Sequence, residues 1–187
     1  MKINRILLFI MLITPLITSC GDDDDDEGNN PSTSVTLGDI AEGNGRIVTT
    51  GDKSVTIDGV MTLSTTGSAS FSGNDFYTAN YALVSDPNGA FVQVYWPQAD
   101  GEVMPSGNYA IALDNADPNN PPSGRFVSLS VVVDGTSYST WTGTTGSAEI
   151  SNTNANYELD MSFTANGLEE FFDDLELNAS GALKYRK

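Results

Sequence analysis

Histidine is absent from the 187-residue chain, and Cys20 is its only cysteine. Serine and cysteine nucleophiles commonly depend on a histidine base, so Ser-His-Asp and Cys-His mechanisms are excluded. Ordinary zinc sites, which draw their ligands from cysteine and histidine, are excluded for the same reason. The composition leaves three kinds of chemistry: a pair of carboxylates, calcium held by oxygen ligands, and binding without catalysis.

Basic residues are also scarce, because 8 Lys and Arg face 25 Asp and Glu and the formal net charge is −17. Proteins bind nucleic acid and anionic lipid headgroups through Lys and Arg side chains. We therefore expect no nucleic-acid partner and no electrostatic attachment to a lipid surface. The large charge of one sign also discourages nonspecific association.

The N-terminus has the pattern of an export signal. Lys2 and Arg5 precede an apolar segment from Ile6 to Ile17. A basic start followed by about 7–15 apolar residues is typical of a secretory signal peptide. The apolar segment is shorter than the roughly 20 residues that a transmembrane helix needs. We therefore predict a signal peptide over residues 1–19.

A cysteine motif follows the apolar segment. The residues Ile17-Thr18-Ser19-Cys20 resemble the lipobox of bacterial lipoproteins, in which an aliphatic residue and two small residues precede a cysteine. The resemblance implies cleavage before Cys20, a diacylglycerol on its sulfur and an acyl chain on its new amino group. The alternative is an ordinary signal peptide with a cysteine near its cleavage site. That alternative is disfavoured because Cys20 has no intramolecular disulfide partner.

An acidic segment separates Cys20 from the rest of the chain. Every residue from Asp22 to Glu27 is acidic, and like charges without apolar neighbours do not fold. Residues 20–34 are therefore expected to form a lipidated tether, for which a solvated spacer is the simplest role. The acidic stretch also resembles the surface-export signal of Bacteroidetes lipoproteins, which implies an outer-membrane protein that faces the cell exterior.

Residues 35–187 have the pattern of an antiparallel all-β domain, because short runs of Val, Ile, Thr, Tyr and Phe alternate with Gly, Asn, Asp and Pro. In Phe126–Val133, alternating apolar and polar residues indicate one buried face and one wet face. Tyr157–Thr164 alternates in the same way, with Glu158 and Asp160 on its wet face. About ten strands predict a β-sandwich or a barrel, and the sequence leaves that choice open.

Tight turns and one helix complete the predicted domain. Asp58-Gly59 and Ser180-Gly181 are among the pairs that predict turns between strands. Leu168, Phe171, Phe172 and Leu175 instead follow the spacing of one helical face, and Asn166 is expected to cap that helix. We therefore predict one short C-terminal helix that covers an edge or end of the sheet. The other predicted strands are 46–50, 54–58, 60–64, 68–72, 78–84, 90–96, 108–113, 147–151 and 182–185.

The general layout resembles the small β-rich lipoproteins of Bacteroidetes, many of which have no assigned function. The resemblance rests on the N-terminus, the strand pattern and the terminal Gly181-Ala182-Leu183-Lys184-Tyr185 segment. It covers the whole chain thinly and supplies no active-site motif. No residue is therefore predicted to be catalytic.

Aromatic residues are the main candidates for a ligand site. Phe91, Gln93 and Tyr95 share one face of the strand 90–96, and Trp141 stands among threonines. An exposed aromatic ring can stack on a sugar ring, so Tyr95 and Trp141 are the predicted ligand-binding residues. The favoured explanation for the large side chains of strand 90–96 is burial on both faces, and the exposed aromatic platform is the alternative.

One loop offers oxygen ligands at short spacing. Asp114, Asp117 and Asn119 are of the types that bind calcium. The loop lacks the residue order of an EF-hand and its bidentate glutamate. We therefore favour an ordinary surface loop and expect no metal and no cofactor.

Two function classes remain. The favoured one is a membrane-anchored, non-catalytic module that binds a glycan, a peptide or a partner protein. The alternative is a carbohydrate hydrolase with two carboxyl groups about 5–9.5 Å apart across a cleft. The first is favoured because acidic residues occur throughout the chain and no pair among them stands out.

Overall fold

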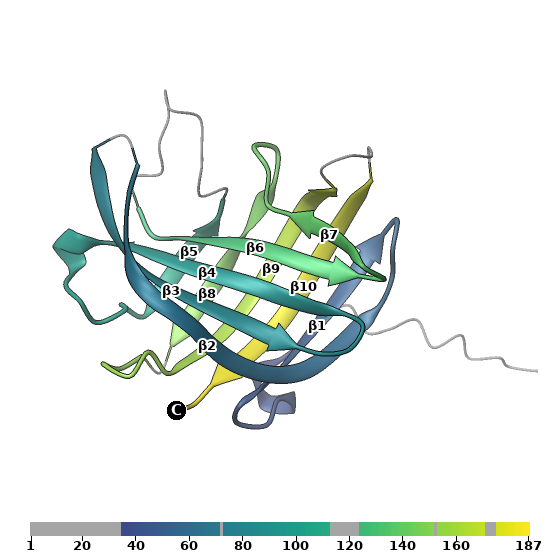
Figure 1. Cartoon of the computed structure of the whole chain (residues 1–187), viewed down its shortest axis with the longest axis horizontal. Helices are drawn as coiled ribbons and strands as arrows, with labels where there is room; N and C mark the ends of the chain where they lie inside the picture. The colour runs from purple at the N-terminus through teal and green to yellow at the C-terminus, as the bar shows by residue number, and fades with distance from the viewer. Residues whose placement is uncertain (1–34, 72, 113–123, 152, 171–174) are drawn as a thin grey trace, which may run out of the picture. The chain divides into compact units, whose positions relative to one another are not determined.

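The computed structural model describes residues 35–187 except 72, 113–123, 152 and 171–174, and Figure 1 shows its ten strands. The strands form one sheet in the order β10-β1-β2-β3-β4-β6-β5-β8-β9-β7. A pairing between β10 and β9 closes nine strands into a barrel, and β7 is an additional strand that pairs with β6 and β9. The prediction of an all-β domain with about ten strands is confirmed, and the architecture is a barrel.

Most neighbouring strands are antiparallel, as the sequence predicts. The exception is β5 and β6, which pair in parallel through Ala110 with Phe126 and Ile111 with Val127. Two short 3-10 helices, η1 (Leu37–Asp39) and η2 (Gln98–Asp100), complete the described elements. The strand bounds are β1 (Asn44–Gly51), β2 (Thr56–Phe71), β3 (Asn74–Val84), β4 (Gly89–Pro97), β5 (Gly107–Ile111), β6 (Phe126–Val133), β7 (Thr136–Ser139), β8 (Thr145–Ser151), β9 (Leu159–Glu170) and β10 (Glu176–Tyr185).

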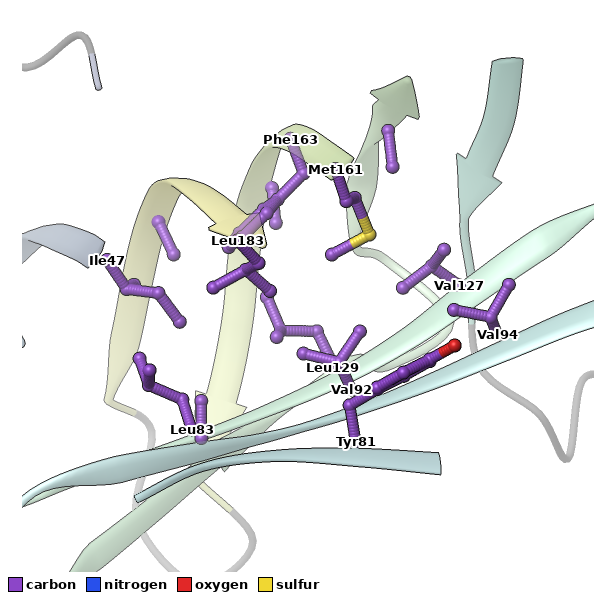
Figure 2. Packing of buried hydrophobic residues seen from close by; sticks show 14 of the residues in the cluster. Ile47, Tyr81, Leu83, Val92, Val94, Val127, Leu129, Met161, Phe163 and Leu183 are labelled. Atoms are coloured by element: carbon purple, nitrogen blue, oxygen red, sulfur yellow. The ribbon is translucent and has the colours of Figure 1, made fainter. Parts of the chain in front are cut away.

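The interior of the barrel is filled by side chains. In β6, Val127, Leu129, Val131 and Val133 are buried, while the residues between them are partly exposed, which confirms the alternation predicted for this strand. Figure 2 shows side chains from β3, β4 and β6 meeting side chains from β1, β9 and β10 across the interior. Large residues such as Trp96 are also fully buried. This close packing makes the interior a core.

Two glycines that the sequence places in turns lie inside strands instead. Gly59 belongs to β2, which is one strand of 16 residues in place of the three predicted there. A Cβ on Gly59 would lie 2.4 Å from the carbonyl oxygen of Val84, and one on Gly181 in β10 would lie 2.5 Å from the ring of Phe163. Glycine inside a strand often marks such a close approach of neighbouring groups. These turn predictions were therefore wrong for a packing reason.

The predicted C-terminal helix is also wrong where the structure describes it. Asn166 to Glu170 continue β9, and β10 begins at Glu176. Leu168 is fully buried and pairs with Leu177 across the β9–β10 ladder. Backbone pairing with β10 along most of β9 outweighs the local helical spacing. Phe171 and Phe172 lie outside the described residues.

A short N-terminal segment lies on the outside of the barrel. The helix η1 packs against β9 and β10, and Ile40, which follows it, is buried. Within the part of the chain that the structure describes, no helix has the length and apolar character needed to cross a membrane.

Candidate functional site

Tyr95, one of the two predicted ligand-binding residues, is only 4 % exposed. Its ring stacks on that of Phe126, with 4.4 Å between centroids and 6° between planes. Phe71 lies edge-on to Tyr95, and Phe76 lies edge-on to Phe126. We call Phe71, Phe76, Tyr95 and Phe126 the outer aromatic cluster, because these residues pack together apart from the main core. The structure therefore places Tyr95 in a packed cluster and not on an open platform.

Trp141, the other predicted residue, is 44 % exposed and lies in the turn between β7 and β8. The turn is closed by hydrogen bonds in both directions: the Trp141 N–H donates to Thr144 Oγ1 (2.7 Å), and the Thr144 N–H donates to the Trp141 carbonyl (3.0 Å). Thr144 Oγ1 also donates to the carbonyl of Gly167 in β9 (2.7 Å). Trp141 thus stands exposed on a backbone that is tied to the barrel.

The remaining predicted positions lie outside the described residues. They are Cys20, the proposed lipidation site, and Asp114, Asp117 and Asn119 of the calcium-like loop. Among the residues that are described, no group of three or more Cys, Asp or Glu is arranged to hold a metal ion.

The outer surface of the barrel is divided by charge. Residues 59–99 carry charge only at Asp75 and Asp86, and residues 126–144 carry it only at Asp134. Asp75 lies beside the β2–β3 turn, and the other two lie between strands. We call the outer face of β2 from Val60 onward, β3, β4, β6 and β7 the charge-free wall. It forms the front of the barrel in Figure 1.

Phe91 lies near the start of β4, the central strand of the charge-free wall, and is 56 % exposed. Its cross-strand partners are Ala82 in β3 and Ser130 in β6. Val60 and Val84, which face each other across β2 and β3, are also exposed. Diagonal neighbours in a sheet are within reach of an aromatic side chain, so Phe91, Val84 and Val60 form one exposed apolar patch.

Hydroxyl groups adjoin this apolar patch on β6 and β7. Ser130 Oγ lies 2.8 Å from Ser137 Oγ and accepts a hydrogen bond from Ser139 Oγ at 2.9 Å. Ser128 Oγ lies 2.9 Å from Thr140 Oγ1. We call these five residues the hydroxyl ladder. Each hydroxyl has one donor and two acceptor positions, so these contacts leave the serines capacity for a ligand, whereas Thr140 is buried.

Sequence reasoning placed Phe91 on the candidate face but selected Tyr95 in its place, and it missed the hydroxyl ladder. Ser128 and Ser130 were predicted on the wet face of their strand, but β7 was not predicted at all. The alternation in β4 does not distinguish the exposure of Phe91 from that of Tyr95, because both residues lie on the same face. A sequence signal exists nonetheless, in the long stretches without charge.

The opposite side of the barrel, formed by the outer faces of β1, β8, β9 and β10, is the charged wall. Arg186 pairs with Asp160 (2.6 Å) and with Glu42, and Lys184 also approaches Glu42 (3.8 Å). Asp160 was predicted to be wet but is 8 % exposed, because this network covers it. The remaining ion pairs between described residues are Arg46–Asp58, Lys53–Asp134 and Arg125–Asp100.

Two shallow cavities lie on the barrel exterior near η1. The larger, of about 340 Å³, includes one carboxylate, that of Glu149, among hydroxyl and amide side chains. The smaller, of about 310 Å³, includes Asp39 and Asp58. Arg46 donates to both oxygens of Asp58 (2.6 and 3.1 Å), and Thr36 donates to Asp39 (2.6 Å). Arg46 therefore holds the carboxylate of Asp58 in place, and Thr36 holds that of Asp39.

Three buried tyrosines have hydroxyls with a raised pKa. Burial raises the pKa of Tyr81 and of Tyr109, whose hydroxyls donate to the carbonyls of Tyr157 (2.7 Å) and Pro105 (2.6 Å). Burial also raises the pKa of Tyr138, whose hydroxyl has no hydrogen-bond partner among the described residues. Tyr81 and Tyr109 are buried and hydrogen-bonded, so their role is in the packing of the barrel.

Comparisons with known proteins supply no relative. No family model, no curated protein and no solved structure matches the chain.

Proposed function

We propose that the protein is a non-catalytic binding module whose ligand contacts the outside of the barrel. The observation that carries this proposal is the filled interior, in which residues as large as Trp96, Tyr81 and Tyr109 are fully buried. Barrels that hold a small ligand keep an internal space for it. Packing of this kind leaves the exterior as the surface for a partner.

The N-terminus supports a proposed place for this module. The motif that ends at Cys20 indicates a lipid anchor, and the acidic tether of residues 20–34 indicates the outer membrane, with the barrel facing the cell exterior. Several acyl chains give stable attachment, since each buried methylene contributes about 0.8 kcal/mol. The barrel would then meet ligands outside the cell.

Replacing Cys20 tests the anchor. Cys20→Ala is expected to leave uncut precursor or to release the protein in soluble form, whereas Ser19→Thr, which keeps the cysteine, should leave it in the membrane. Fractionation of cells expressing each variant, followed by mass measurement of the protein, reports the result. Mature-sized Cys20→Ala protein in the membrane fraction would show that the anchor is wrongly assigned.

A direct comparison of binding with turnover tests the module itself. Full-length protein in detergent is incubated with glycan and peptide libraries, and both retained ligand and released product are measured. We expect retention without product. Product formation that is abolished by Glu149→Gln, or by another Asp or Glu substitution, would favour the carbohydrate hydrolase instead.

A further inference from the structure

The apolar patch on the charge-free wall has a free-energy cost in the isolated barrel, because it exposes apolar surface to water. Val60, Val84 and Phe91 are 56 %, 57 % and 56 % exposed, so each leaves most of its surface in water. Single exposed apolar residues are common. Here, however, Val60 and Val84 are cross-strand partners, and Phe91 is a diagonal neighbour of Val84. A contiguous apolar patch of this kind is typical of a binding surface.

The groups beside the patch are uncharged and polar. Gln93 lies two residues from Phe91 on the same face of β4 and pairs with Ser128 of the hydroxyl ladder. Neighbouring strands are about 4.7–4.9 Å apart, so the ladder begins one strand away from Phe91 and ends on β7, about 10 Å away. Trp141 follows Thr140, the last residue of the ladder.

A sugar ring matches both parts of this surface. A pyranose has an apolar face of C–H groups, which packs on an aromatic ring, and a rim of hydroxyls that donate and accept hydrogen bonds. Serine, threonine and glutamine side chains also donate and accept. We propose, as a refinement that rests on the proposed function, that the charge-free wall binds a neutral glycan chain, with Phe91 stacked on one sugar and Gln93 and the serines of the hydroxyl ladder paired with its hydroxyls.

Charge decides against an acidic glycan. The formal net charge is −17, and the side chains of Arg46, Lys53, Arg125, Lys184 and Arg186 are already in ion pairs. A polyanion would be repelled by the whole molecule and would find no cation on the charge-free wall. A neutral glycan is not repelled by this charge and needs no cation on the wall.

Composition decides against a protein partner on this wall. The centres of protein interfaces are enriched in aromatic residues, Met and Arg and are depleted of Ser. Here four of the five ladder residues are serines, and one of them, Ser130, is the cross-strand partner of Phe91. A surface with this many hydroxyls is better suited to a ligand that carries hydroxyls itself.

Binding to polysaccharides of known charge tests the proposal. Full-length protein in detergent is titrated calorimetrically with soluble neutral glucan, mannan and xylan, and with polygalacturonate as the acidic comparison. We expect binding to at least one neutral chain and none to polygalacturonate. The affinity should change less than about twofold between 50 and 500 mM salt, because no ion pair forms.

Matched variants locate the site. Phe91→Ala and Gln93→Ala are each expected to weaken binding about tenfold or more, which corresponds to about 1.4 kcal/mol. The controls are Val103→Ala, an exposed apolar residue outside the wall, and Ser162→Ala on the charged wall, both of which should bind as the wild type does. The melting temperature of each variant shows that the barrel is folded.

The outcomes separate this inference from the proposed function. Neutral-glycan binding that survives both Phe91→Ala and Gln93→Ala would overturn the site while the binding module stands. Absence of neutral-glycan binding, salt-sensitive binding of polygalacturonate alone, or self-association abolished by Phe91→Ala would overturn the ligand class. Turnover of any of these chains would overturn the proposed function as well.

Discussion

The charge-free wall and the charged wall belong to one sheet and enclose one core, yet their outer faces differ. Arg46, Glu149, Asp160 and Lys184 lie in the strands of the charged wall, whereas the charge-free wall presents Val, Phe, Ser, Thr, Asn and Gln. The charged wall shows that this barrel folds with ionised side chains on its exterior. Folding therefore does not require the opposite exterior to lack them, and binding is a better reason for that absence.

A second contrast lies within the charge-free wall itself. Phe91 and Tyr95 are both aromatic, both in β4 and on the same outward face. Phe91 is exposed between Ala82 and Ser130, whereas Tyr95 is covered between Thr78 and Phe126. The wall is thus a packed cluster toward the end of β4 and an open surface toward its start. Substitutions in this one strand should therefore affect stability at Tyr95 and binding at Phe91.

The largest effect is expected from truncating the outer aromatic cluster. Phe126→Ala removes a ring that contacts Phe71, Phe76 and Tyr95, and it should lower the free energy of unfolding by about 3–5 kcal/mol. Phe91→Ala should change it by less than about 0.5 kcal/mol, since the side chain is exposed. Urea unfolding followed by tryptophan fluorescence measures both.

That comparison can also fail. If Phe126→Ala unfolds at the same urea concentration as the wild type, the outer aromatic cluster does not stabilise the barrel. If Phe91→Ala is as unstable as Phe126→Ala, Phe91 is a packing residue, and its proposed role in binding loses its support.

A smaller effect is expected at alkaline pH, from the interior that both walls share. The hydroxyl of Tyr81 in β3 is buried and donates to Tyr157, and its ring lies 5.5 Å from that of Tyr185 in β10. Burial raises the pKa of Tyr81 above the value of about 10 expected in the unfolded chain. The contribution of this group to stability is therefore full below pH 10 and is lost as the pH rises toward the folded-state pKa.

The sign of this effect gives a measurable slope. Above pH 10 the folded state holds the phenol proton more tightly than the unfolded chain, so stability falls by about 1.4 kcal/mol per pH unit for this tyrosine. Tyr81→Phe is expected to be about 1 kcal/mol less stable at pH 7, because a hydrogen bond is lost, and to have a shallower slope above pH 10. Urea titrations at pH 7, 10.5 and 11.5 provide both values, and equal slopes in the two proteins would contradict the assignment.

Local patterns predicted much of the fold. The bounds of β6 follow directly from alternating Val, Leu and Ser residues, because period-two alternation is a property of the strand itself. The turn predictions at Gly59 and Gly181 were wrong because those glycines make room for neighbours that are distant in sequence. The helical spacing around Leu168 misled for a similar reason, since pairing with β10 determines that segment.

The sequence by itself determined that the domain is all-β, that histidine-based catalysis is excluded and that long segments carry no charge. These properties depend only on residue types and on their order along the chain. The tertiary structure decided that the sheet closes into a barrel, that the uncharged segments form one wall, and that Phe91 is open while Tyr95 is covered. Closure and exposure depend on which strands become neighbours, and the side chains that cover Tyr95 come from other strands, β2, β3 and β6.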